Sequence, residues 1–125
     1  MKLCSACLLG IRCRYDGKSK PRKNVIGLAK KEVLIPVCPE QLGGLSTPRK
    51  PSERKGRKVI MKGGKDVTKN FKRGSRNVLK IAKTLGVKSA IFKEKSPACG
   101  SGGVATELLR KNGIKVISEE EIHVK

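Results

Sequence analysis

The sequence predicts an α/β domain whose mainly parallel sheet is flanked by helices and accompanied by a small hairpin. Two observations predict this fold. Segments typical of strands and of helices alternate along the chain, which is the order of βαβ units. The apolar run "EVLIPVC" at 32–38 is continuous, as in a strand buried on both faces. A length of 125 residues suffices for one core, so a single domain over 1–125 is expected.

The first third of the chain is expected to hold two strands and a short helix. The apolar segment "KLCSAC" at 2–7 reads as a strand that enters a glycine-bearing loop reaching Pro21. The stretch "NVIGLAKK" at 24–31 favours a short helix, because Asn24 can cap it and its apolar residues share one face. The second strand is the buried run at 32–38.

The middle of the chain is expected to be a long loop followed by a hairpin. Residues 39–56 are rich in proline and glycine, which indicates a loop and not a linker between domains. The stretch "KVIMKGGKDVT" at 58–68 is typical of a small hairpin that turns at Gly63 and Gly64.

The clearest helix is predicted at 68–85. Its apolar residues share one face, Thr68 can cap its start, and Gly86 ends it. The rest of the chain is expected to form a strand within 87–95, a helix at 104–112 ended by Gly113, a strand at 114–118 and an acidic surface tail at 119–122.

Charge is the most unusual bulk property, with 30 Lys and Arg against 10 Asp and Glu and a net charge of +20. A soluble surface needs a net charge of only about 2 to 8, and heat-adapted chains raise lysine and glutamate together. The excess therefore indicates a polyanionic partner, with RNA the first candidate. Aromatic residues make up only 2% of the sequence, so contact through phosphates is expected and not base stacking.

The sequence is typical of a cytoplasmic protein. No segment approaches the roughly 18 unbroken apolar residues of a membrane span, and the N-terminus has no signal-peptide pattern. In that reducing compartment, cysteines are expected to be thiols, metal ligands or catalysts and not disulfides. The chain has five of them, which are Cys4, Cys7, Cys13, Cys38 and Cys99.

Three of the cysteines are predicted to meet at one edge of the sheet. Cys7 lies just past the first strand, Cys38 ends the second, and Cys99 follows the strand within 87–95. Ligands of parallel sheets bind beyond the carboxyl ends of the strands. These three side chains are therefore expected at one site.

Soft thiolates gathered at one point bind zinc or an iron–sulfur cluster. Three cysteines on a four-iron cluster leave one iron without a protein ligand, and that iron can act as a Lewis acid, as an open catalytic zinc does. The glycines around Cys99 allow a cluster to approach closely, and the N-terminus of the following helix is expected to favour its negative charge.

Other interpretations of the cysteines stay open. An isolated cysteine is commonly a small buried apolar residue. Cys4 and Cys7 form a C-x-x-C pair, which is also typical of redox pairs and of half a zinc site. Cys13 has no evident mate and is expected to pack within its loop, with a supporting role beside the ligands as the alternative.

Two polar residues stand close to these cysteines in sequence. Glu40 follows Cys38 by two residues in "CPEQLGG", and Ser96 precedes Cys99 by three in "SPAC". A carboxylate beside a metal site can activate water or move a proton. The plainer alternatives are a solvated loop charge for Glu40 and a turn or cap serine for Ser96.

Five stretches together resemble the thiouracil desulfidase family and lie in order over nearly the whole chain: "SACLLGIRCRYDG", "IPVCPEQLGGLSTPR", "GKDVT", "KEKSPACGSG" and "LLRKNGIKVIS". The resemblance implies a non-redox enzyme that replaces the sulfur of a thiolated uracil by oxygen. It implies a [4Fe–4S] cluster held by Cys7, Cys38 and Cys99, with one iron lacking a protein ligand. It also implies that the substrate's sulfur binds that iron while water, assisted by Glu40, attacks the thiocarbonyl carbon, and that Ser96 helps in positioning or proton transfer.

The chain departs from the family pattern at two places. Cys4 stands where members usually have an apolar residue, which favours a packing role. Many relatives carry an extra loop after "SPxCG", whereas here Ser101 and Gly102 lead almost directly into the helix at Val104. A site opened in this way is expected to admit a thiolated uracil within tRNA as well as the free base. The sequence does not distinguish a 2-thio from a 4-thio base.

Two other functions compete with the desulfidase interpretation. One is a basic RNA-binding module whose cysteines hold structural zinc. The other is a thiol redox protein that uses Cys4 and Cys7.

Overall fold

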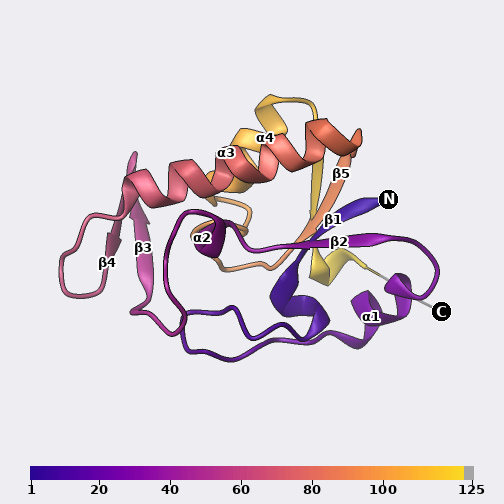
Figure 1. The fold of residues 1–125 in the computed structure, drawn as a ribbon, viewed down its shortest axis with the longest axis horizontal. Coiled ribbons are helices and arrows are strands. Elements are labelled where there is room, and N and C mark those ends of the chain that lie inside the picture. Colours follow the sequence, from indigo (N-terminus) through magenta and orange to yellow (C-terminus); the bar gives the residue numbers. More distant parts are fainter. Residues whose placement is uncertain (123–125) are drawn as a thin grey trace.

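The computed structural model describes residues 1–122, and a four-stranded sheet forms the centre of this part of the chain (Figure 1). All of its neighbouring strands run parallel, in the order β2-β1-β5-β6. The mainly parallel α/β architecture expected from the sequence is therefore confirmed. The strands are β1 (Lys2–Ser5), β2 (Leu34–Val37), β5 (Ser89–Phe92) and β6 (Lys115–Ser118).

Helices cover both faces of the sheet. Successive side chains of each strand point to opposite faces, so each strand contributes to two cores. Leu3 packs in a core with side chains of α3 (Thr68–Leu85) and α4 (Val104–Lys111). The next residue, Cys4, packs in a second core on the side of α1 (Lys23–Ala29). Burial on both faces explains why the strands read as continuous apolar runs.

The strand order places a ligand crevice next to the centre of the sheet. The connection from β1 to β2 passes through α1, and the connection from β5 to β6 passes through α4 on the opposite face. The winding direction therefore reverses between the neighbouring strands β1 and β5. In open α/β sheets, ligands bind beyond the carboxyl ends of the strands at such a switch point.

The expectation of one long loop over 39–56 was wrong, because this stretch holds the short helix α2 (Pro39–Leu42) and the strand β3 (Ser52–Lys55). Proline is favoured in the first turn of a helix, where its missing N–H has no partner to lose, so Pro39 starts α2 and does not exclude it.

The expected hairpin is present, and a further strand extends it. The chain turns at Gly63 and Gly64 as predicted, and Ile60 forms an antiparallel bridge with Asp66 across this turn. The strand β4 (Lys58–Met61) also pairs with β3 across a two-residue turn in which Gly56 has a φ of 62°. The sequence of β3, "SERK", has no apolar residue and none of its residues is buried, so the strand escaped detection.

Helix α3 begins and ends close to the predicted limits, but its expected cap was wrong. Val67 occupies the N-cap position, and Thr68 is already helical. The Thr68 hydroxyl accepts the Val59 N–H at 2.9 Å instead, which ties the helix to the hairpin. Gly86 ends the helix in the left-handed conformation, as predicted.

The caps and tail expected around α1 and the C-terminal end also differ. Asn24 lies inside α1, and its amide donates to the carbonyl oxygens of Glu119 and Ile122 at 3.1 and 2.7 Å. The expected surface tail at 119–122 contains the 3-10 helix η2 (Glu119–Glu121), and Glu119 is only 1% exposed. Its carboxylate accepts the Glu94 N–H at 2.7 Å, so the segment anchors the end of β5.

Helix α2 is locked onto α3 by close backbone contact. A Cβ on Gly74 would lie 1.8 Å from the Pro39 carbonyl oxygen, so only glycine allows this approach. Asn70 and Asn77 of α3 donate to the carbonyl oxygens of Gly43 and Leu42, both at 2.9 Å.

None of the helices within residues 1–122 is long and apolar enough to cross a membrane.

Candidate functional site

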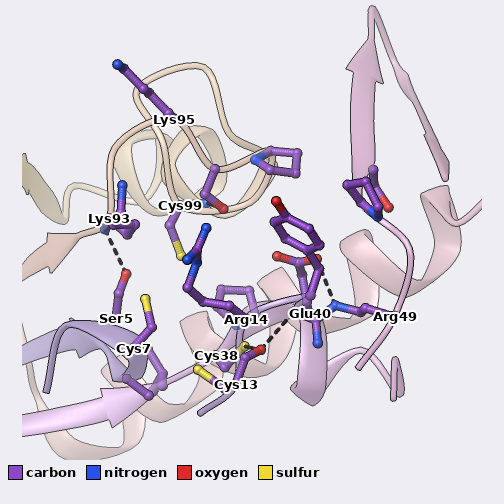
Figure 2. Close-up of a pocket in the computed structure, with 18 of the residues that line it drawn as sticks. Ser5, Cys7, Cys13, Arg14, Cys38, Glu40, Arg49, Lys93, Lys95 and Cys99 are labelled. Atoms are coloured by element: carbon purple, nitrogen blue, oxygen red, sulfur yellow. Dashed lines mark hydrogen bonds and ion pairs between the residues drawn. The ribbon is translucent and has the colours of Figure 1, made fainter. Parts of the chain in front are cut away.

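A cavity of about 220 Å³ lies beyond the carboxyl ends of β1, β2 and β5 (Figure 2). We call it the thiol cavity, because four cysteine side chains line it. The structure brings together every site residue predicted from the sequence and adds Cys13 to them. The residues concerned are Cys7, Cys13, Cys38, Glu40, Ser96 and Cys99.

The three predicted ligands come from three strand ends. Cys7 lies in the 3-10 helix η1 (Ala6–Leu9) directly after β1, and Cys38 is the N-cap residue of α2 directly after β2. Cys99 lies in the loop between β5 and α4. In Figure 2, the side chains of Cys7 and Cys99 point toward each other from two sides of the cavity.

The loop that carries Cys99 is tightly wound. The Ser96 hydroxyl accepts the N–H groups of Ala98 and Cys99 at 3.2 and 3.1 Å. A Cβ on Gly100 would lie 2.7 Å from the Ser96 carbonyl oxygen, so the turn requires glycine there. Ser96 thus fills the structural role of a turn serine while it lines the cavity.

Two carboxylates hold the ends of this loop. Glu94 accepts the N–H groups of Lys95 and Ser101 at 3.2 and 2.9 Å, and the hydrogen bond from Ser101 is the main reason that the pKa of Glu94 is lowered. Lys95 adopts a positive φ of 62°, which is rare for a residue other than glycine. The carboxylate of buried Glu119 accepts the Glu94 N–H and so fixes the start of this loop.

The N-terminus of α4 does not present free N–H groups to the cavity as expected. The N–H of Val104 donates to the Pro97 carbonyl, and those of Ala105 and Thr106 donate to the Ala98 carbonyl. The loop itself therefore satisfies the amides that were expected to favour an anion.

Cys13 belongs to the site, although the sequence favoured loop packing for it. The Cys38 thiol donates to the Cys13 carbonyl at 3.8 Å, and the neighbouring side chains of Cys38 and Cys7 both shift the pKa of Cys13. The Arg49 guanidinium donates to the Cys13 carbonyl at 2.9 Å and so fixes the loop that returns Cys13 to the cavity. The only available signal was its place within the stretch "SACLLGIRCRYDG".

Burial and neighbouring thiols favour the protonated form of Cys13, Cys38 and Cys99 by raising the pKa of each. The hydrogen bond to Cys13 and burial raise the pKa of Cys38, and burial raises that of Cys99. For Cys13, the hydrogen bond from Cys38 lowers the pKa, but the bond to Cys7 and burial outweigh it and raise the pKa to about 11. A bound metal must therefore displace protons from the site.

Glu40 is clamped by a buried arginine at the cavity wall. Arg49 Nε donates to Glu40 Oε1 at 3.1 Å, and the Arg49 side chain is only 3% exposed. Arg49 also donates to the Ser46 carbonyl and the Thr47 hydroxyl, at 3.1 and 2.9 Å. Glu40 is therefore a fixed, ion-paired carboxylate and not the solvated loop charge of the plainer alternative.

Ser5 supports Cys99 and was missed from the sequence. The Ser5 hydroxyl accepts the Lys93 N–H at 2.9 Å and lines the cavity together with the Cys99 thiol. Burial raises the pKa of Cys99, and the Ser5 side chain partly offsets this effect. Ser5 is the last residue of β1 and is 2% exposed, so the sheet itself places it.

Cys4 lies apart from the cavity. It is fully buried in the core on the α1 side, its thiol donates to the Ser5 carbonyl at 3.5 Å, and burial raises its pKa to about 12. A reactive redox cysteine needs a lowered pKa and access to solvent. The structure therefore favours the packing role over the redox pair with Cys7.

The residues of the cavity fit an iron–sulfur cluster better than a single metal ion. Thiolates are the ligands that iron–sulfur clusters use, and four thiols line this one cavity. A zinc ion needs ligands that converge on one point. Within residues 1–122, no three His, Cys, Asp or Glu side chains are grouped closely enough to hold one metal ion.

Comparisons with known proteins point to one family. A family model described as 2-thiouracil desulfurase matches residues 3–121. A solved structure of TudS, a [4Fe-4S]-dependent thiouracil desulfidase, superposes with a TM-score of 0.91 at 40% identity and covers 97% of this chain and 91% of that one.

A curated relative is the uncharacterised protein YbbK of Bacillus subtilis (strain 168). It is 36% identical over an alignment of 148 positions, which covers 98% of this chain and 98% of that one. That length exceeds the 125 residues of this chain, so YbbK has residues that this chain lacks. With the family model matching nearly the whole sequence, the chain belongs to the 2-thiouracil desulfurase family.

Proposed function

We propose that the chain is an enzyme that converts a thiolated uracil to uracil and releases sulfide, with a [4Fe–4S] cluster in the thiol cavity. The observation that carries the proposal is a cavity at the switch point of the sheet that combines cysteine thiols with a half-buried carboxylate clamped by Arg49. The likeness to TudS at 40% identity supports the same cofactor and reaction.

Cys7, Cys38 and Cys99 are the proposed cluster ligands, because each comes from a different strand end and together they surround the cavity. Cys13 is proposed as a supporting neighbour, since it lines the same cavity and its carbonyl accepts the Cys38 thiol at 3.8 Å. When bound, such a cluster supplies a Lewis-acidic iron that three protein thiolates leave without a fourth protein ligand.

The reaction replaces sulfur by oxygen without net oxidation or reduction. Water adds its oxygen to the thiocarbonyl carbon, the carbon–sulfur bond breaks, and sulfide leaves with protons that come from the water. Glu40 accepts a proton from the attacking water, and the Arg49 clamp fixes its carboxylate for that task. The Ser96 hydroxyl accepts two N–H groups, which leaves its own proton free to donate to the substrate or to the departing sulfur.

The rim of the cavity offers a flat surface for a pyrimidine. Tyr15 is 39% exposed and lines the cavity, with the Arg14 guanidinium 5.5 Å from the centre of its ring. Exposed aromatic rings bind unstacked bases by their faces. The proposed substrates are thiolated uracil as a free base or within tRNA.

The proposal also includes the cellular setting. The five cysteines are free, as the described structure shows, and both they and an iron–sulfur cluster need a reducing compartment. A cytoplasmic enzyme that folds as one domain is therefore proposed.

The decisive test is sulfide release by anaerobically purified, cluster-loaded protein. Free 2-thiouracil, free 4-thiouracil and thiolated tRNA should be compared side by side with the Glu40→Gln variant. The wild type should release sulfide from at least one substrate, and Glu40→Gln should keep its iron content but lose turnover. Full activity of Glu40→Gln would remove its catalytic role, and no release from any substrate would refute the function.

The same preparation separates this proposal from the zinc-bound RNA-binding module. A protein that holds a four-iron cluster is brown and absorbs broadly in the visible range. A zinc protein is colourless, so a colourless but metal-loaded preparation would favour the alternative.

A further inference from the structure

Helix α3 carries six cationic side chains on one face, all of them exposed. At about 100° per residue, they fall within an arc of roughly 100°. They run from the first to the last turn of the helix, and α3 contains no acidic residue. We call this set the basic stripe, and it consists of Lys69, Lys72, Arg73, Arg76, Lys80 and Lys83.

The basic stripe has no partner in the described part of the chain. Within residues 1–122, none of its six side chains forms an ion pair or a side-chain hydrogen bond. Arg76 lies four residues from both Lys72 and Lys80, and like charges at this spacing destabilise a helix. A face that repels itself along its whole length indicates an anionic partner.

Hollows in the surface connect the basic stripe with the thiol cavity. Arg73 of the stripe lies beside Gly44, where a Cβ would be 3.6 Å from its guanidinium, and Gly44 borders a hollow of about 430 Å³. This hollow is also bordered by Lys50 and Lys62, and it shares Arg49 with the thiol cavity. A shallower hollow beside both contains one acidic residue, Asp16, which is paired with an arginine at 3.3 Å. A long polyanion can therefore follow a mainly cationic path from α3 to the rim of the cavity.

The other flank of the stripe is also cationic. A groove of about 510 Å³ lies between the hairpin, α3 and α4, and Lys72 and Arg76 line it together with Arg57 and Lys111. Its one acidic lining residue, Glu107, is paired with Arg54 at 2.7 Å and with Lys111 at 3.3 Å. Cationic side chains therefore border the stripe on both sides.

We propose that the basic stripe binds the phosphate backbone of an RNA whose thiolated uracil enters the thiol cavity. This inference rests on the proposed function, which supplies the reason that the polyanion is RNA. The stripe itself fits a row of phosphates, because its exposed arc consists of cations alone.

An anionic membrane fits this surface less well. A helix that binds in a membrane interface inserts an apolar face. The apolar face of α3 is already packed in the core through Phe71, Val78 and Ala82.

Salt-dependent binding of an unmodified tRNA transcript tests the inference. One variant replaces Lys72, Arg73, Arg76 and Lys80 by Gln. A control variant replaces Lys30, Lys31, Lys88 and Lys115 by Gln, which removes the same charge from exposed positions at the amino ends of β2, β5 and β6. The stripe variant should bind at least about tenfold more weakly, with a slope of log affinity against log salt reduced by about 3 to 4. The control variant should keep most of the wild-type slope.

Three results would overturn the inference. They are a wild type that does not bind the transcript, an equal loss in both variants, and stripe-dependent binding to phosphatidylserine vesicles in place of the transcript. Turnover of free 2-thiouracil keeps the two proposals apart, because the stripe variant should retain it. If the wild type releases no sulfide from any substrate, the proposed function fails whatever the binding result.

Discussion

The thiol cavity and the basic stripe of α3 depend on the sequence in different ways. The cavity assembles residues as far apart as Cys7 and Cys99, and most of them are buried or half-buried. The stripe lies within the 18 residues of one helix, is exposed, and has no partner among residues 1–122. Chemistry at the first region requires precise placement, whereas attraction at the second requires only charge.

After Glu40→Gln itself, loss of the Arg49 clamp should have the largest effect among the changes that leave all cavity thiols in place. Arg49→Ala frees the Glu40 carboxylate, and a misplacement of about 1 Å can cost roughly 100-fold in turnover. Sulfide release by the cluster-loaded variant should fall by about that factor while its iron content stays the same.

A double variant shows whether Arg49 acts through Glu40. If it does, Glu40→Gln with Arg49→Ala should be no slower than Glu40→Gln alone, because effects within one unit do not add. Independent, additive losses would contradict the clamp. Arg49→Lys is expected to rescue little, since one ammonium cannot replace the four bonds of this guanidinium.

The contact between α2 and α3, which lies between the two regions, should contribute to the free energy of unfolding. Gly74→Ala places a Cβ against the Pro39 carbonyl, where α3 packs on the helix that carries Glu40. Overpacking of this kind costs about 1–3 kcal/mol, and a contact with backbone favours the upper end. Urea unfolding measures the loss, and Gly102→Ala, which meets nothing within 4 Å, is the matched control. Equal stability of both variants would contradict the tight α2–α3 contact.

The smallest effect is expected in the basic stripe, where a substitution should raise stability and not lower it. Arg76→Gln removes repulsion with Lys72, Arg73 and Lys80, so the free energy of unfolding should rise by about 0.5 kcal/mol at low salt. Glutamine and arginine have similar helix propensities, so charge is the main change. The gain should shrink as salt is added. A loss of stability would show that Arg76 has a structural partner.

The same contrast explains what could be predicted from sequence. The parallel sheet and the convergence of three strand-end cysteines follow from the order of the elements, because the carboxyl ends of parallel strands share one edge. Helix α3 was predicted closely, since its apolar period and the stop at Gly86 are local signals. The ligand and catalytic roles of the converging residues remain proposals.

What was missed depends on contacts between distant segments. Cys13 reaches the cavity because Arg49, 36 residues away, holds its carbonyl. Glu119 looked like part of an exposed acidic tail but is buried against the end of β5. Strand β3 has no apolar residue, and none of its residues is buried in a core. Periodicity in the sequence does not reveal these pairings.

The central claim is that three of the four cavity thiols hold the cluster and that Cys13 does not. The most direct measurement is the iron and acid-labile sulfide content of Cys13→Ala and Cys38→Ala, prepared anaerobically in parallel with the wild type. Cys13→Ala is predicted to retain the full cluster and its visible absorption, and Cys38→Ala to lose both, as are Cys7→Ala and Cys99→Ala. Loss of the cluster from Cys13→Ala as complete as that from Cys38→Ala would instead show four protein ligands and contradict an iron open to substrate.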